Sequence, residues 1–128
     1  MGEVISNFRD LRVYKLAFEL QQSVFDLSKS FPPEERYALT DQGRRSSRSI
    51  GANISEAWQK RRYPAHFVSK LTDADGEQTE TQHWLDTAYA CAYIAREEHQ
   101  KLLAKCRRVG QMLGTMIAHP EKFCPNAR

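Results

Sequence analysis

The sequence predicts an all-α protein, folded as an antiparallel up-and-down four-helix bundle. Apolar residues recur in alternating steps of three and four along nearly the whole chain, which is the spacing of one helix face. Short proline-containing breaks separate these stretches, and no segment alternates with the period of two that is typical of a strand. We expect a single domain, because four amphipathic helices with short connections form such a bundle. The domain covers residues 1–128, with helices at about 10–30, 34–60, 64–95 and 97–118 and an irregular tail at 119–128.

The first helix carries a broad apolar face. Its central stripe advances by four and three residues and consists of Val13, Ala17, Leu20, Val24 and Leu27. The segment Phe31-Pro32-Pro33 ends this helix, because proline removes a backbone donor and restricts the residue before it. The second helix then begins somewhere between residues 33 and 41, since both Pro33-Glu34-Glu35 and Thr40-Asp41 favour a first helical turn.

The second helix has a seam of mostly small or polar residues. Small side chains let a neighbouring backbone approach closely, whereas a buried amide without a partner costs about 1–3 kcal/mol. We therefore expect Asn53, with Glu56 one turn further on, to form a polar part of the seam that fixes the register of the helices. The seam consists of Leu39, Gly43, Ser46, Ile50, Asn53 and Ala57.

The third helix is long and contains Gly76, which costs about 1 kcal/mol in a helix relative to alanine. Gly76 therefore marks either a local break or a close helix crossing, and the crossing is favoured. The apolar face of the third helix consists of Phe67, Leu71, Ala74, Gln78, Leu85, Ala88 and Ala92. The last helix resumes the pattern with Leu102, Leu103, Cys106, Val109, Gly110, Leu113 and Ile117, and His119-Pro120 ends it.

Size and composition indicate a folded domain that needs no disulfide or metal cross-link. A chain of 128 residues with 41% hydrophobic and 27% charged residues is outside the disordered and fibrous classes. No stretch approaches the roughly 20 apolar residues of a membrane helix, and the N-terminus lacks a signal-peptide core. We therefore expect a cytoplasmic protein that makes no contact with a membrane.

The sequence offers no catalytic or metal-binding constellation. Cys91, Cys106 and Cys124 lack CxxC or Cys/His spacing and are expected to be structural thiols. Glu80 and His83 form one Glu-x-x-His motif, but a di-iron bundle needs two. Neither a glycine-rich phosphate loop nor a nucleophile elbow is present. We predict no enzymatic activity, no cofactor and no metal.

Charge is distributed by helix. Residues 36–62 carry seven basic and two acidic groups, whereas residues 63–95 carry one basic and five acidic groups. This pattern is typical either of a protein with an electrostatic face or of complementary helices packed together.

The candidate functional site is the basic side of the second helix. Arg44 and Arg48 lie four residues apart on one helical face, with Arg45 beside them, and no acid occurs between Gln42 and Ser55. Arginine suits phosphate, and such contacts give salt-sensitive nucleic-acid binding without base readout. The charge continues at the helix C-terminus, where the helix dipole also favours cations. The candidate nucleic-acid-binding residues are Arg44, Arg45, Arg48, Lys60, Arg61 and Arg62.

A structural interpretation of the same residues stays open. Asp41 can pair with Arg44 or Arg45, and the acidic third helix can absorb other cations in salt bridges within or between subunits. Only Tyr37, Trp58 and Tyr63 lie near the basic segment as rings on which bases could stack, and such rings are often core or interface residues.

A set of motifs spread over the chain carries a further signal. It consists of FRDLRVYKLAFEL, Phe31-Pro32, Glu35, Tyr37, Leu39, Gln42, Arg44-Arg45, Ser49-Ile50, Asn53-Ile54-Ser55-Glu56, Ala74, Gly76, Glu80 and Ile94. In these motifs the chain resembles the small four-helix-bundle proteins encoded in intervening sequences of 23S ribosomal RNA genes. The resemblance covers about residues 8–117, with alanine at 57, serine at 55 and Glu77 as departures from the usual pattern.

The resemblance implies an all-helical protomer in a homopentameric ring, with no established catalytic activity and no cofactor. Related bundles are accessory proteins of the reverse transcriptases of diversity-generating retroelements, which implies RNA or DNA and a polymerase as partners. Leftover apolar residues on the first helix also favour self-association; they are Leu11, Tyr14, Phe18 and Phe25.

Two functional hypotheses remain. The first is an oligomeric adaptor that binds the phosphate backbone of RNA or DNA. The second is a protein-binding, self-assembling scaffold, in which the arginines of the second helix meet Asp73, Asp75 or Glu80 across a subunit interface.

Overall fold

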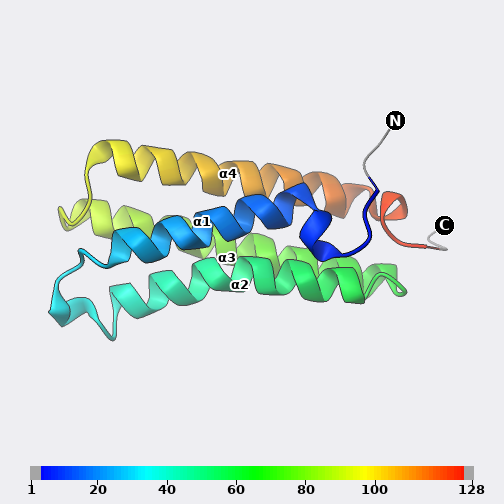
Figure 1. Ribbon diagram of the computed structural model, residues 1–128, viewed down its shortest axis with the longest axis horizontal. Coiled ribbons are helices and arrows are strands. Elements are labelled where there is room, and N and C mark those ends of the chain that lie inside the picture. The colour runs from blue at the N-terminus through cyan, green and yellow to red at the C-terminus, as the bar shows by residue number, and fades with distance from the viewer. Residues whose placement is uncertain (1–3, 126–128) are drawn as a thin grey trace.

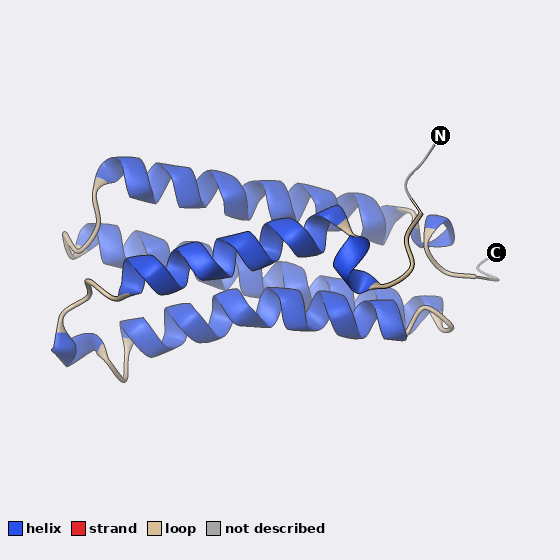
Figure 2. Cartoon of the chain, in the orientation of Figure 1, coloured by secondary structure: helices blue, strands red, loops and turns tan. Residues whose placement is uncertain are grey.

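The computed structural model describes residues 4–125 and contains four α-helices, which lie side by side with successive connections at alternating ends (Figure 1). They are α1 (Arg12–Ser28), α2 (Leu39–Gln59), α3 (Pro64–Ala90) and α4 (Arg96–Ala118). Helix and loop account for all of the described chain, with no strand in residues 4–125 (Figure 2). The predicted all-α bundle is therefore confirmed, and α1 and α3 each pack between α2 and α4.

The core follows the heptad spacing of the sequence. On α3 the buried residues advance strictly by four and three, and Thr81 fills the position that the apolar pattern alone skipped. Ala92, expected on this face, is exposed because the helix has already ended. The buried positions of α3 are Phe67, Leu71, Ala74, Gln78, Thr81, Leu85 and Ala88.

Helices α2 and α3 approach closely through the small seam of α2. A Cβ built on Gly43 would lie 4.0 Å from Trp84 Cβ, and the buried hydroxyls of Ser46 and Thr81 are 2.9 Å apart. Thr81 also bonds the backbone oxygen of Glu77 at 2.9 Å, so the pair is satisfied within the interface. A hydrogen-bonded hydroxyl pair avoids the penalty of an unpaired buried polar group and defines how the two helices meet.

Helix α1 starts two residues later and ends two residues earlier than the expected bounds of 10–30. The later start has a local cause. A 3₁₀-helix, η1 (Phe8–Asp10), precedes α1, because Asn7 and Asp10 cap it reciprocally. The Asn7 side chain accepts from the Arg9 amide at 2.9 Å, and Asp10 accepts from the Asn7 amide at 3.2 Å. The backbone then becomes extended at Leu11, and the α-helix starts one residue later.

Helix α2 starts at Leu39, inside the expected interval of 33–41 but later than the bound of about 34. Pro33 begins only a 3₁₀-helix, η2 (Pro33–Glu35). The reason is the Glu35 carboxylate, which accepts from the Leu39 amide at 3.4 Å and from the Tyr93 hydroxyl at 2.9 Å. This hydrogen bond raises the pKa of Tyr93 to about 12 and ties the α1–α2 connection to the α3–α4 connection.

Helix α3 ends at Ala90 rather than 95 because the chain makes a Schellman turn without glycine. Ala92 has a φ of 62°, the Ala92 amide bonds the Tyr89 oxygen at 3.0 Å, and the Tyr93 amide bonds the Ala88 oxygen at 2.9 Å. An alanine in the left-handed region gives no sequence signal for a stop. Helix α4 then starts at Arg96, within one residue of the expected position.

The tail, expected to be irregular over 119–128, has defined structure as far as residue 125. Pro120–Lys122 form a 3₁₀-helix, η3, after which Phe123 stacks on Phe67 with centroids 6.0 Å apart, and Cys124 is buried. The chain therefore closes the end of the bundle with its own C-terminal segment. The expected tail residues 126–128 lie outside the described part.

Gly76 is not at a helix crossing. A Cβ at Gly76 would meet nothing within 4 Å, whereas a Cβ at Gly110 would lie 2.7 Å from Gln78 Nε2. Gln78 cannot easily withdraw, since its amide also donates to Asp75 at 2.9 Å and accepts from Gln82 at 2.8 Å. The close approach is thus made at Gly110, between α3 and α4.

This difference gives a matched pair of substitutions. Gly76→Ala is expected to raise the free energy of unfolding by up to about 1 kcal/mol, because alanine is the better helix former. The free energy of unfolding of Gly110→Ala is expected to be about 1 kcal/mol or more below that of Gly76→Ala, because the added methyl group displaces the Gln78 amide. Urea denaturation measures both, and equal stability changes would contradict the placement of the crossing.

The docked tail predicts a stability role for Phe123. Phe123→Ala is expected to lower the free energy of unfolding by about 2 kcal/mol, less than the 3–5 kcal/mol of a fully buried ring. Lys122→Ala, at an exposed position next to it, is the control and should change stability by less than about 0.5 kcal/mol. A Phe123→Ala protein as stable as the control in urea denaturation would mean that the tail does not support the core.

Candidate nucleic-acid interface

Arg45 forms salt bridges with two glutamates of α3. Its Nη1 lies 3.2 Å from Glu77 Oε2, its Nη2 bonds Glu80, and its Nε donates to Gln42 at 3.2 Å. Hydrogen bonds to the two glutamates raise the pKa of Arg45, and bonds from Trp84 and Arg45 lower the pKa of Glu80. The pairing hypothesis therefore holds for Arg45, and the pairing is within one chain.

Arg44 and Arg48 turn the other way, toward α1. The Cζ atoms of Arg44 and Arg48 lie 4.7 and 5.5 Å from the ring centroid of Phe25. Arg44 Nε also donates to the buried hydroxyl of Ser28 at 2.7 Å, which fixes the direction of its guanidinium. Asp41, which the sequence offers as a partner of Arg44 or Arg45, forms no salt bridge with either of these two among residues 4–125.

The difference between Arg45 and its neighbours Arg44 and Arg48 follows from helical rotation. Successive residues are rotated by about 100° around a helix, so Arg44 and Arg48 share an edge of α2 while Arg45 lies on the next. The edge of Arg45 faces the acids of α3, and the edge of Arg44 and Arg48 faces the rings of α1. No carboxylate forms a salt bridge with Arg44 or Arg48 within the described residues.

The rings of α1 continue this surface along the edge of α1 that faces α2. Tyr14 and Phe18 have centroids 6.1 Å apart, and a Cβ on Gly51 of α2 would lie 3.4 Å from Tyr14. Phe18 is 45% exposed. We call this surface the α1–α2 strip, and it consists of Tyr14, Phe18 and Phe25 with Arg44 and Arg48.

The three basic residues after α2 also differ in their contacts: one packs on the protein and two are exposed. Arg61 is structural, with its Nε donating to the Trp58 oxygen at 2.8 Å and its Cζ 3.5 Å from the Trp58 ring centroid. This supports the helix-dipole interpretation for Arg61, since it satisfies a C-terminal carbonyl. Lys60 and Arg62 are exposed, and Arg62 lies 5.7 Å from the ring of Tyr63, which is 54% exposed.

The polar seam residues lie at the edge of the α2–α3 interface. Asn53 is only half-buried and donates to the Ser49 oxygen of its own helix at 2.9 Å, so it does not bridge two helices. Glu56 makes the interhelical contact, with Lys70 Nζ at 2.8 Å, and this hydrogen bond lowers the pKa of Glu56. The buried pair of Ser46 and Thr81 takes the role expected of Asn53.

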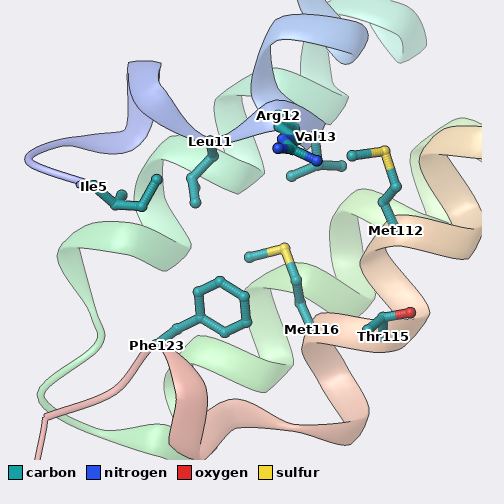
Figure 3. Close-up of a pocket in the computed structure, with 8 residues that line it drawn as sticks. All are labelled: Ile5, Leu11, Arg12, Val13, Met112, Thr115, Met116 and Phe123. Carbon is teal, nitrogen blue, oxygen red and sulfur yellow. The ribbon is translucent and has the colours of Figure 1, made fainter. Parts of the chain in front are cut away.

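An apolar pocket at one end of the bundle supplies no reacting group. It has a volume of about 410 Å³ and lies where Ile5, Leu11 and Val13 meet Met112 and Met116 of α4, next to Phe123 (Figure 3). Arg12 and Thr115 also line it, and its lining within residues 4–125 contains no carboxylate, imidazole or thiol. Burial raises the pKa of the Cys106 thiol to about 12, which suppresses its thiolate. Within residues 4–125 there is no group of three or more metal-ligating side chains.

The rings of the α1–α2 strip are the part of the site that sequence reasoning missed. Tyr14, Phe18 and Phe25 lie 19 to 34 residues from the arginines and were expected only as apolar surface. A signal existed, since steps of four and seven place the three rings on one edge of α1. Which edge of α2 they meet follows only from the packing of the helices.

Comparison with known proteins agrees with the fold. Residues 9–115 match the 23S rRNA-intervening sequence protein family. A crystal structure of a protein of unknown function of the S23 ribosomal protein family from Bacteroides thetaiotaomicron is similar, with 30% sequence identity and a TM-score of 0.75. The match covers 83% of this chain and 95% of that protein. No curated protein matches the chain, and no helix among residues 4–125 has the length and apolarity required to span a bilayer.

The Arg45 cluster predicts a pH dependence of stability. Because the pKa of Glu80 is lowered in the folded protein from 4.5, its stabilising contribution is present above about pH 4.5 and is lost as the pH falls further. Glu80→Gln should therefore lose less stability than the wild type between about pH 7 and pH 3.5. Urea denaturation at each pH measures this, with Glu97→Gln, an exposed α4 residue, as control. Parallel pH profiles for wild type and Glu80→Gln would contradict the assignment.

Proposed function

The chain belongs to the 23S rRNA-intervening sequence protein family, and we propose that it is a non-enzymatic adaptor that binds the phosphate backbone of RNA or DNA. The observation that carries the proposal is the convergence of Arg44 and Arg48 on the ring of Phe25 without a carboxylate in salt-bridge contact among the described residues. Two like charges held near one ring repel each other, and a phosphate between them offsets that repulsion.

Preorganisation supports the same function. Stacking on Phe25 and the bond to Ser28 restrict the Arg44 guanidinium before any ligand arrives, so little further side-chain entropy is lost on binding. Lys60 and Arg62 are further exposed cations, at the C-cap of α2 and beyond it. Lys60 lies about 18 Å from Arg48 along the axis at 1.5 Å of rise per residue, and about 120° further around it. It is therefore a separate phosphate contact on another face of α2, and affinity from such contacts falls steeply with salt.

The scaffold hypothesis has a weaker basis in its original form. It requires Asp73, Asp75 or Glu80 of α3 to pair with arginines of another subunit, and of these Glu80 already binds Arg45 in the same chain. Asp73 and Asp75 form no salt bridge among residues 4–125, so the hypothesis now rests on these two acids. Assembly into a homo-oligomer, a pentamer by family resemblance, is compatible with phosphate binding and is proposed as the quaternary context. A polymerase partner is likewise proposed only from the resemblance.

The test is fluorescence anisotropy of labelled RNA and DNA between about 50 and 200 mM salt. The wild type should bind with a negative log–log salt slope, and Arg44→Gln with Arg48→Gln should reduce that slope by about one to two, one per lost phosphate contact. Arg107→Gln with Arg108→Gln removes the same charge from exposed positions on α4, outside the α1–α2 strip, and should leave most of the affinity.

Two outcomes would overturn the proposal. One is the absence of binding even at about 50 mM salt, where non-specific phosphate contacts are strongest. The other is an equal loss for the α2 and α4 double variants, which would mean that net charge alone is sensed.

A further inference from the structure

The α1–α2 strip presents a ring face that phosphate binding does not use. Phe18 is 45% exposed and has no cation from residues 4–125 over its ring, unlike Phe25, which has Arg44, Arg48 and Lys29 within 5.5 Å of its centroid. The two rings lie seven residues apart on the same edge of α1, about 10 Å along the helix. A cationic position and an open aromatic position therefore follow one another along one edge of α1.

The chemistry of such a surface distinguishes single strands from duplexes. A duplex offers its phosphates but keeps the faces of its bases stacked inside the helix, whereas an unpaired base can stack on an exposed ring. The hydroxyl-bearing ring of Tyr14 beside Phe18, with centroids 6.1 Å apart, widens the platform. Cations and rings arranged along one groove are the general pattern of single-strand binding.

A second copy of the chain that met the strip by a two-fold axis would be a poor occupant. Such a contact would bring four arginines together with no carboxylate on the strip to balance them. A head-to-tail contact with α3 of another copy would have Asp73 and Asp75 to offer, since Glu77 and Glu80 are bound to Arg45 in their own chain. The charge of the strip itself favours a polyanion, and the native mass in the experiment below tests the head-to-tail contact.

We propose that the α1–α2 strip selects single-stranded RNA or DNA over duplex, with phosphate held by Arg44 and Arg48 and an unpaired base stacked on Phe18. This inference rests on the proposed function and adds the strandedness of the ligand. It assigns no base sequence, since every base has a face that can stack.

The experiment compares a single strand of about 12 nucleotides, the matching duplex and an abasic strand of equal length, all labelled, in anisotropy titrations. Phe18→Leu keeps the apolar contacts of the side chain but removes the ring, and it should weaken binding of the single strand about 5- to 100-fold. Binding of the duplex and the abasic strand should change by less than about twofold, because neither offers a free base face.

The matched control is Tyr89→Leu, since Tyr89 is 42% exposed on α3 and lies outside the strip. It should leave all three affinities unchanged. The salt slope of Phe18→Leu should equal that of the wild type, because no phosphate contact is lost. Circular dichroism and native mass of each variant establish that fold and assembly are the same.

The outcomes separate this inference from the proposed function. If no nucleic acid binds, both fail together. If single strand, duplex and abasic strand bind alike and Phe18→Leu has no effect, phosphate binding stands and single-strand selection is wrong. If Phe18→Leu instead lowers the native mass, the strip is covered by a second copy and the inference is overturned.

Discussion

The close packing of α2 against α3 determines where the charges of this protein lie. The glycine and serines of the α2 seam let the two helices meet at the Ser46–Thr81 hydroxyl pair, 2.9 Å apart. At that separation Arg45 reaches Glu77 and Glu80 directly, and Lys70 reaches Glu56. Larger seam residues would move these pairs apart, and the acidic face of α3 would then be open to other cations.

The same packing leaves the opposite edge of α2 unbalanced. Helical rotation places Arg44 and Arg48 away from α3, where they meet aromatic rings in place of carboxylates. A half-exposed ion pair such as that of Arg45 contributes at most about 1 kcal/mol to stability, so its main effect is to fix where charges lie on the surface. It engages Glu77 and Glu80, which leaves Arg44 and Arg48 as positive charges on the α1–α2 strip.

The ends of the bundle are closed by contacts between segments far apart in sequence. Glu35 connects the α1–α2 and α3–α4 connections through Tyr93, and Phe123 packs on Phe67 at the other end. The first contact fixes the connection that joins α1 to α2, and the second fixes the tail against α3. The α1–α2 strip therefore lies on packed helices, and such a site keeps its side chains in place for recognition.

The sequence by itself determined the four helices and most of the core, because heptad spacing and proline breaks are local signals that packing did not override. It also indicated the basic segment and the absence of a catalytic constellation. It could not determine the ends set by tertiary contacts, such as the Glu35 cap, the Ala92 turn and the docked tail. Nor could it divide Arg44 and Arg48 from Arg45, because the partner of each side chain lies on another helix and is chosen only when the helices pack.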